Sequence, residues 1–412
     1  MRLSGTNIEH TRSFNRRVVL EAVRRHGPIS RAEIARLTSL SPQTVSNIAL
    51  ELRESGLIRA EGRRRAARGQ PPVELSIDPA GGYTVGLQLD HARLSGVLVN
   101  LAGTVCGRTV EPIATPEPAT AMPRLAAAVE ALIDGAEVPR TRVLGCGVVM
   151  PGPFDVETLS SVGPTTLPGW HGIDVAGRLT AATGLPVLVE NDATAAALGE
   201  RLHGAARDLR TFFYLYLGVG LGAGLILDGQ PYRGAWGNAG EFGHIVVAPD
   251  GAPCFCGNNG CLERYASLHA AFEAMRAAGK CVGTTADLAA LAAAGDPAMT
   301  GWLDSAARHL RIALNAVENL LDPEAVLIGG DLPDRLAEAL IDRLTPLPPS
   351  VSARRDRHWP RLIRATAGAE ATALGAAALP LFDSVSPSFS LLVKNGARSA
   401  PEESAAALAV AP

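Results

Sequence analysis

The chain of 412 residues has almost no lysine, since Lys280 and Lys394 stand beside 36 arginines. We interpret this bias as a feature of the genome and not of the protein's chemistry. The chain also lacks any run of about 18 apolar residues, so no membrane-spanning helix is expected. The N-terminal segment MRLSGTNIEHTRS lacks the apolar stretch of a signal peptide. We therefore expect a cytoplasmic protein without a membrane partner.

Disulfides are not expected either, because thiols stay reduced in the cytoplasm. Three of the six cysteines nevertheless fall within eight residues, at Cys254, Cys256 and Cys261, and His244 lies ten positions before the first of them. Clustered cysteines in a reducing compartment bind metal more often than they pair with one another. The segment GEFGHIVVAPDGAPCFCGNNGCLE (240–263) is therefore a candidate metal site.

The net charge of −3 is divided unevenly along the chain. Residues 1–75 hold 14 Arg and 7 Glu, whereas the remainder holds 24 basic and 34 acidic residues. A basic head on an acidic body predicts that only the head meets a polyanion. The length exceeds that of one compact domain, so two or three domains are expected.

The basic head contains the pattern of a helix-turn-helix. Residues 15–26 predict a first helix that stops at Gly27. Ser30 and Glu33 form a capping-box pattern that starts a second helix, whose inward residues we expect to be Ile34, Ala35 and Leu37. Ser41-Pro42 is an N-cap followed by proline, which starts a third helix. Its buried side is predicted to hold Val45, Ile48 and Leu52, and its DNA-reading side Gln43, Thr44, Ser46 and Asn47.

A basic wing follows the third predicted helix. Arg63, Arg64, Arg65 and Arg68 lie between two predicted strands, and the slim tip 68–71 suits an arginine that enters a narrow minor groove. The alternative is a small protein-interaction domain whose arginines are solvated. Because the turn, the caps, the wing and the charge asymmetry agree, we favour a winged helix-turn-helix DNA-binding domain over residues 1–78.

From Gly82 onward, apolar strands alternate with helices, which indicates α/β architecture. This part resembles the ROK family of sugar kinases and sugar-responsive repressors, up to about Phe382. The resemblance rests on the motifs VVMPGPFD, LPGW, VENDATAAALGE, LGVGLGAGLILDGQPYRG, NAGEFGH, CFCGNNGCLE and LDPEAVLIGG. A winged helix-turn-helix ahead of this body is the layout of the family's repressors, and the chain is similar to xylose- and N-acetylglucosamine-responsive repressors.

The resemblance implies a two-lobed, actin-like ATPase (sugar-kinase-like) fold. We expect a smaller lobe over 82–190 with a return segment at about 362–382. A larger lobe with the cysteine loop would span 191–361. The tail 383–412 is rich in small residues and proline, and we expect it to be disordered.

The resemblance also implies that His244, Cys254, Cys256 and Cys261 bind zinc. Zinc prefers thiolates and neutral imidazole in a tetrahedron, and four protein ligands leave no position for an activated water. The expected Zn²⁺ is therefore structural. The alternative is three core thiols and an unrelated histidine. A metal on one imidazole nitrogen fixes the other as an N–H donor, and in the family this donor points at a sugar hydroxyl.

The residues that the family uses for a monosaccharide correspond here to Asn191, Asp192, Glu241, His244 and Glu263. Carboxylates and amides form the paired hydrogen bonds that discriminate among sugar hydroxyls. As alternatives, Asn191 and Asp192 suit a helix N-terminus, and the two glutamates suit solvated positions. Thr166 stands where the family often has asparagine, so the preferred sugar or its orientation stays open.

Family kinases carry an Asp-x-Gly-Gly-Thr turn that binds phosphate, and Asp192 would be the general base of such a kinase. The matching stretch here is Gln88-Leu89-Asp90-His91-Ala92, in which an aspartate and larger side chains replace the glycines. We therefore expect no enzyme activity. The predicted function is a sugar-responsive regulator of carbohydrate-metabolism genes, a repressor, that binds operator DNA as a homodimer or homotetramer. The alternatives are a sugar kinase with an appended DNA-binding head and a regulator controlled by a partner protein.

Overall fold

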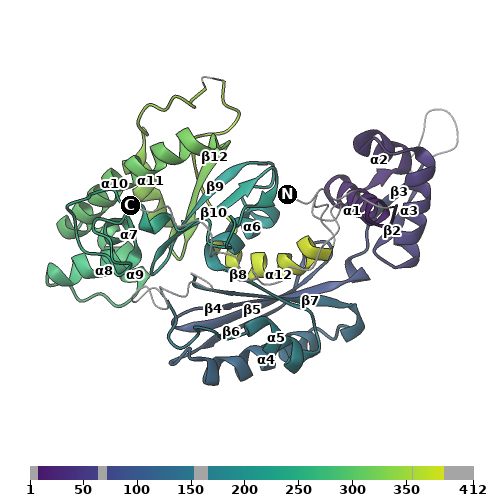
Figure 1. The fold of residues 1–412 in the computed structure, drawn as a ribbon, viewed down its shortest axis with the longest axis horizontal. Helices are drawn as coiled ribbons and strands as arrows, with labels where there is room; N and C mark the ends of the chain where they lie inside the picture. Colours follow the sequence, from purple (N-terminus) through teal and green to yellow (C-terminus); the bar gives the residue numbers. More distant parts are fainter. Residues whose placement is uncertain (1–7, 64–71, 153–165, 355, 385–412) are drawn as a thin grey trace, which may run out of the picture. The chain divides into compact units, whose positions relative to one another are not determined.

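The computed structural model describes residues 8–63, 72–152, 166–354 and 356–384 (Figure 1). The chain divides into two compact units, one formed by the residues up to Gly81 and one by Gly82–Leu381. Each unit is built around apolar cores of its own. None of the helices within these ranges is both long and apolar enough to cross a membrane.

The first unit is a winged helix-turn-helix. Three helices pack on a small antiparallel sheet whose strand order is β1-β3-β2. The helices are α1 (Ile8–His26), α2 (Arg31–Thr38) and α3 (Pro42–Glu54), and the strands are β1 (Ile29–Ser30), β2 (Ile58–Arg63) and β3 (Val73–Ile77). Val45, Ile48 and Leu52 of α3 are buried in this core, as predicted.

The predicted caps of the second and third helices are confirmed. The Ser30 hydroxyl oxygen accepts the Glu33 N–H at 3.3 Å, and the Glu33 carboxylate accepts the Ser30 N–H at 2.9 Å. Ser41 caps α3 by accepting the Thr44 N–H at 3.1 Å. The prediction for Leu37 is wrong, because its side chain is 56% exposed. Only Ile34 of the eight-residue α2 is buried, so periodicity across so short a helix did not determine which side chains face the core.

The second unit contains two five-stranded sheets with the same topology. The first sheet has the order β6-β5-β4-β7-β8 and the second the order β11-β10-β9-β12-β13. In each, three consecutive strands pair antiparallel and two later strands add in parallel. The strands are β4 (Tyr83–Leu89), β5 (Arg93–Asn100), β6 (Val105–Pro112), β7 (Val143–Met150), β8 (Val187–Asn191), β9 (Phe212–Leu217), β10 (Leu221–Leu227), β11 (Gln230–Pro231), β12 (Ala325–Gly330) and β13 (Leu362–Arg364).

One boundary differs from the expectation. Residues 362–364, assigned above to the smaller lobe, form β13 and pair in parallel with β12 of the second sheet. The return to the first sheet is made by α12 (Ala371–Ser384), whose residues Ala373, Leu374 and Ala377 pack on β5. The expected tail from 385 onward lies outside the described residues.

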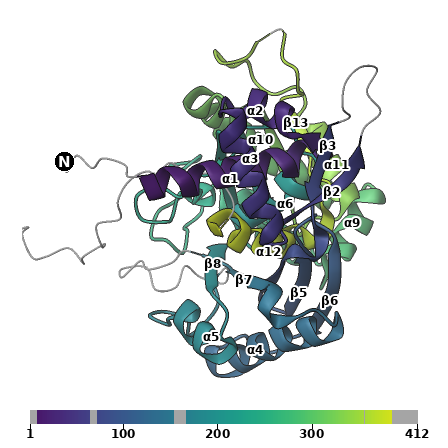
Figure 2. The same ribbon diagram turned by 90° about the vertical axis from the view of Figure 1, so that its right-hand side faces the viewer.

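Helices cover both sheets and also fill the space between them. α4 (Pro118–Gly135) and α5 (Val175–Thr183) lie on one face of the first sheet, and α12 lies on the other (Figures 1 and 2). α6 (Asp192–His203) packs on β9 and β10 of the second sheet. A side chain at Gly375 of α12 would lie 1.7 Å from the Ala195 carbonyl oxygen of α6, so glycine is required where these two helices cross.

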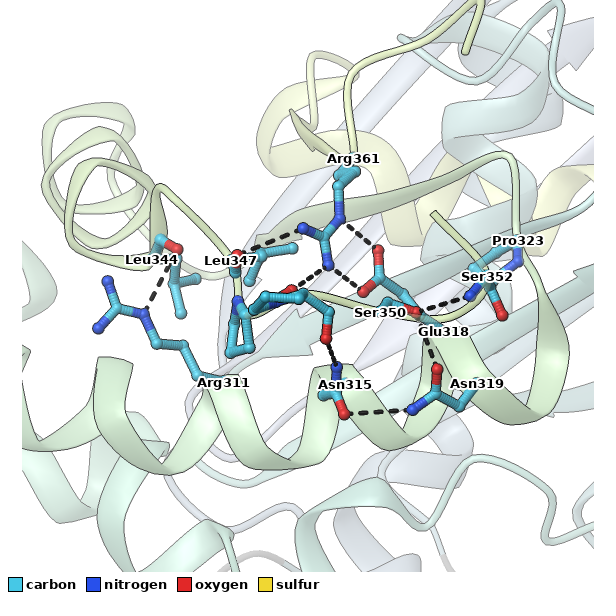
Figure 3. A network of polar contacts seen from close by, with 12 residues as sticks. Arg311, Asn315, Glu318, Asn319, Pro323, Leu344, Leu347, Ser350, Ser352 and Arg361 are labelled. Carbon is cyan, nitrogen blue, oxygen red and sulfur yellow. Dashed lines mark hydrogen bonds and ion pairs between the residues drawn. The ribbon is translucent and has the colours of Figure 1, made fainter. Parts of the chain in front are cut away.

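The opposite face of the second sheet is covered by α7 (Glu263–Ala266), α8 (Leu268–Ala277), α9 (Thr285–Ala293), α10 (Pro297–Leu321) and α11 (Asp334–Leu344). The loop between α11 and β13 is held on α10 by polar contacts (Figure 3). Arg361 donates to Oε1 of the buried Glu318 at 2.8 Å and to the Pro348 carbonyl at 2.8 Å. Asn315 donates to the Pro349 carbonyl at 3.0 Å. These contacts keep β13 at the sheet edge.

Candidate functional site

A cavity of about 740 Å³ lies in the second unit and is lined by residues that follow or begin strands of both sheets. All five residues predicted to bind a sugar line it, namely Asn191, Asp192, Glu241, His244 and Glu263. They come from the β8–α6 junction, from the short helix η4 (Phe242–His244) and its N-cap, and from the start of α7. The fold therefore gathers side chains that are up to 72 positions apart in the chain.

The β8–α6 junction presents Asn191 and Asp192. Asn191 is the N-cap of α6, and its Oδ1 accepts the Thr194 N–H at 2.7 Å. Asp192 is half-buried, and its Oδ1 accepts the Ala193 N–H at 2.8 Å. Burial, together with the neighbouring Asp331 and Glu241 carboxylates, raises the pKa of Asp192 to about 7. Asp192 can therefore exchange a proton near neutral pH, and the capping role of Asn191 leaves its amide N–H₂ for a ligand.

Two glutamates form the other acidic wall. Glu263 is buried, and its Oε2 accepts the Leu221 N–H at 3.0 Å. Burial raises the pKa of Glu263 to about 7. Burial also raises the pKa of Glu241, which is half-buried beside η4. These surroundings argue against the alternative of fully solvated charges.

The four predicted metal ligands form one cluster. His244, Cys254, Cys256 and Cys261 each offer an atom, and these atoms all lie within 4.8 Å of one another. The Cys254 Sγ and His244 Nδ1 atoms are 3.6 Å apart, as are the Cys256 and Cys261 Sγ atoms. The edges of a tetrahedron with zinc bonds of about 2.0–2.3 Å are roughly 3.3–3.8 Å long. The spacing and the donor types therefore fit a tetrahedral zinc ion.

The cysteine loop is folded back by backbone contacts of its own. Isolated bridges pair Val246 with Cys261 and Pro253 with Asn259. Gly260 has φ of +69°, and a side chain there would lie 1.5 Å from the Ala248 carbonyl oxygen. Only glycine permits this close approach, which brings Cys261 beside His244.

His244 connects the cluster with the cavity. Its Nδ1 atom faces Cys254, while its Nε2 atom lies 4.0 Å from Oε2 of Glu241 inside the cavity. Burial lowers the pKa of His244, which favours the neutral imidazole that binds metals. A metal on Nδ1 would leave Nε2 as an N–H donor directed toward the cavity.

The stretch Gln88-Leu89-Asp90-His91-Ala92 also lines the cavity. It forms the end of β4 and the turn into β5. Sequence reasoning missed Asp331 and its partner Arg93, which lie in the same lining. The sequence did offer one indication for Asp331, because this residue directly follows Gly329-Gly330, the glycine pair that ends β12.

In the first unit, α3 presents the four predicted DNA-contacting residues near its N-terminal end. Gln43 and Asn47 are exposed, and the Gln43 amide donates to Asn47 Oδ1 at 3.0 Å. Thr44 and Ser46 are half-buried. Arg63 is the last residue of β2, and Arg64, Arg65 and Arg68 lie outside the described residues.

Comparisons with known proteins match the two units separately. The sequence profile of the ROK family matches residues 84–381, and that of the MarR family matches residues 13–69. The xylose repressor of Bacillus subtilis is 28% identical over 78% of this chain and 83% of its own length. The DNA-binding transcriptional dual regulator NagC of Escherichia coli is 25% identical over 79% of this chain and 82% of its own length.

Two solved structures extend the likeness to three dimensions. A ROK family transcriptional regulator, described as a homologue of the Escherichia coli MLC protein, has a TM-score of 0.74 and 28% identity. The similarity covers 91% of this chain and 98% of that one. A ROK hexokinase from Thermus thermophilus has a TM-score of 0.59 and 33% identity, covering 72% of this chain and 96% of that one. The ROK architecture thus occurs in a regulator and in a kinase.

Proposed function

The chain belongs to the ROK family, and we propose that it is a sugar-responsive transcriptional repressor of carbohydrate-metabolism genes. One observation carries the proposal: a winged helix-turn-helix and a ROK cavity lined by acidic residues and His244 occur in the same chain. The names of the xylose repressor and of NagC support this assignment. The winged helix binds operator DNA as part of a homodimer or homotetramer, and a monosaccharide or its derivative binds in the cavity.

Binding of the sugar is proposed to depend on hydrogen bonds from five side chains. Asp192, Glu241 and Glu263 accept from sugar hydroxyls when they are ionised and donate to them when they are protonated. The Asn191 amide and the His244 Nε2–H donate. Because the hydroxyls of epimers point in different directions, such a set discriminates among sugars.

His244, Cys254, Cys256 and Cys261 would hold a structural Zn²⁺. The ion would supply a fixed tetrahedral anchor and no open coordination position. Its proposed effect is to keep the His244 ring in one orientation and one tautomer. The distances within the cluster support zinc, since two Sγ atoms and an Sγ–Nδ1 pair are both separated by 3.6 Å.

The proposal is tested with DNA. Random duplexes that the full chain retains would be selected and sequenced, and the affinity for the selected site would then be measured with and without D-xylose, D-glucose and N-acetylglucosamine. We expect one sugar to lower the affinity for the selected site at least about tenfold, a coupling of roughly 1.4 kcal/mol. DNA binding that no sugar changes would contradict sugar control and favour control by a partner protein. The absence of any selected sequence would contradict the repressor itself.

A sugar kinase is the second candidate, because the pKa of Asp192 near 7 suits a general base. Release of ADP from Mg-ATP in the presence of a sugar, lost in Asp192→Asn, would favour the kinase. The replaced phosphate turn argues against it, and we expect no ADP release above the rate without sugar.

A further inference from the structure

The turn between β4 and β5 already contains an anion. Oδ1 of Asp90 accepts the N–H groups of both Ala92 and Arg93, at 2.8 and 2.9 Å. The Asp90 N–H donates to the Arg93 carbonyl at 3.0 Å and closes the turn. Consecutive backbone N–H groups in a turn form a concave site for anions. Here the chain's own carboxylate fills that site.

Arg93 connects this turn with the other sheet. Its Nε atom lies 2.9 Å from Oδ2 of Asp90, and its Nη2 atom lies 3.1 Å from Oδ1 of Asp331. Asp331 directly follows β12 of the second sheet, 238 positions away in the chain. The Tyr216 hydroxyl lies 3.3 Å from the second Asp331 oxygen. The three charged residues thus form one chain of contacts across the cavity.

We propose that Asp90, Arg93 and Asp331 form an internal bridge that takes the place of a bound phosphate group and makes the cavity reject phosphate esters. The bridge ties the two sheets together without a nucleotide. This inference rests on the proposed sugar pocket and specifies its ligand as an uncharged sugar. In this proposal the Asp90 carboxylate fills the pair of backbone N–H groups that could otherwise bind a phosphate oxygen, and Arg93 supplies its countercharge.

The charges at this end of the cavity support the bridge. A phosphate ester carries about −1.5 to −2 charges near neutral pH. To reach Arg93 it must displace Asp90 or Asp331, which would leave a partly buried carboxylate without its cation. Asp192 adds a further acidic group to the same lining. An uncharged sugar meets none of these obstacles.

A second ion pair offers a matched comparison. Nε of Arg233 lies 2.5 Å from Oε2 of Glu190, which is buried at the end of β8. Arg233 follows β11, so this pair also joins the first sheet to the second. Neither Arg233 nor Glu190 is part of the cavity lining to which the Asp90 turn belongs. Arg233→Ala therefore removes an arginine that joins the sheets and leaves the anion position filled.

The test measures binding of pyrophosphate and of glucose 6-phosphate to the full chain by calorimetry. Asp90→Ala should bind both at least about tenfold more tightly than the wild-type protein, because it frees two N–H groups and the Nε side of Arg93, while Asp331 still holds Nη2. Arg93→Ala should show no gain, since the cation is lost, and Arg233→Ala should show none either. None of these measurements needs DNA or the natural effector, so they are independent of the repressor assignment.

The bridge would be overturned by a folded Asp90→Ala whose affinity for pyrophosphate equals that of the wild-type protein. Circular dichroism shows whether the variant is folded. If it is not, Asp331→Asn keeps the hydrogen bonds of the turn and releases Arg93 from the second sheet. It should then bind pyrophosphate severalfold more tightly than wild type, and an unchanged affinity would also contradict the proposal.

Discussion

The Nδ1 atom of His244 faces the Sγ atom of Cys254 at 3.6 Å. The other nitrogen of the same ring lies in the cavity, 4.0 Å from Glu241. A single imidazole therefore borders both the cysteine cluster and the candidate sugar pocket. A substitution or metal loss at the cluster is expected to change the position of His244 Nε2 in the pocket, because the ring is rigid and its two nitrogens point in different directions.

The first prediction concerns the metal. Purified protein should contain about one zinc ion per chain, and Cys256→Ser should lose it and destabilise the ROK unit by about 2 kcal/mol or more. Elemental analysis and thermal unfolding measure the two effects. Cys106→Ser is the control, because Cys106 is exposed and is not part of the cluster. Zinc content that is unchanged in Cys256→Ser would contradict the assignment of this ligand.

The second prediction concerns the pH dependence of stability. The pKa of Asp192 is about 7 in the folded protein and near 3.8 in the unfolded chain. Between these values the folded state binds a proton that the unfolded state does not, so this group's contribution to stability falls as the pH rises from about 4 to about 7. Asp192→Asn removes that loss. The free energy of unfolding of Asp192→Asn, taken relative to that of the wild-type protein, should therefore be about 1–2 kcal/mol higher at pH 8 than at pH 5. This range is reduced to allow for the partial exposure of Asp192.

Urea unfolding of the ligand-free protein at the two pH values measures this difference. Asp174→Asn is a suitable control, since Asp174 caps α5 and lies outside the cavity lining. A stability difference between Asp192→Asn and wild type that is the same at both pH values would show that Asp192 does not carry the shifted proton.

The third prediction concerns the buried ion pair of Figure 3. Glu318 is 1% exposed, and Arg361 contacts both of its carboxylate oxygens. Arg361→Ala should lower the free energy of unfolding by about 3–5 kcal/mol, because it leaves a buried charge unpaired. Arg210→Ala removes an exposed ion pair with Asp228 and should change the free energy of unfolding by less than about 1 kcal/mol. Equal effects in chemical denaturation would contradict this account.

The fourth prediction concerns DNA recognition. Gln43→Ala or Asn47→Ala should reduce binding to the selected site by roughly 1–3 kcal/mol and leave binding to a random duplex unchanged. Arg65→Ala or Arg68→Ala should weaken binding to both duplexes and reduce the slope of affinity against salt concentration. Fluorescence anisotropy over a salt series separates the two behaviours. If both arginine variants keep the wild-type slope of affinity against salt concentration, the wing does not contact DNA.

Local patterns in the sequence predicted the features whose physical cause lies within a few residues. The capping box of Ser30 and Glu33 and the start of α3 at Pro42 are such features, because their hydrogen bonds join residues three positions apart. The local spacing of Cys254, Cys256 and Cys261 indicated a candidate metal site, and the resemblance to the ROK family implied the full ligand set with His244. The start of α1 at Ile8, earlier than the expected Asn15, and the exposed Leu37 show the limit of such patterns.

What the sequence determined by itself was therefore the identity of the elements and the residue types that the pocket would contain. Only the tertiary structure decided which charges face one another across the cavity. Arg93 meets Asp331 across 238 positions, and Arg233 meets Glu190 across 43. No spacing rule relates these residues, because each pair joins a residue of the first sheet to a residue near the second sheet, and the sheets are brought together by tertiary packing. The glycine contacts at that packing interface decide how closely the sheets approach, and the ion pairs follow from it.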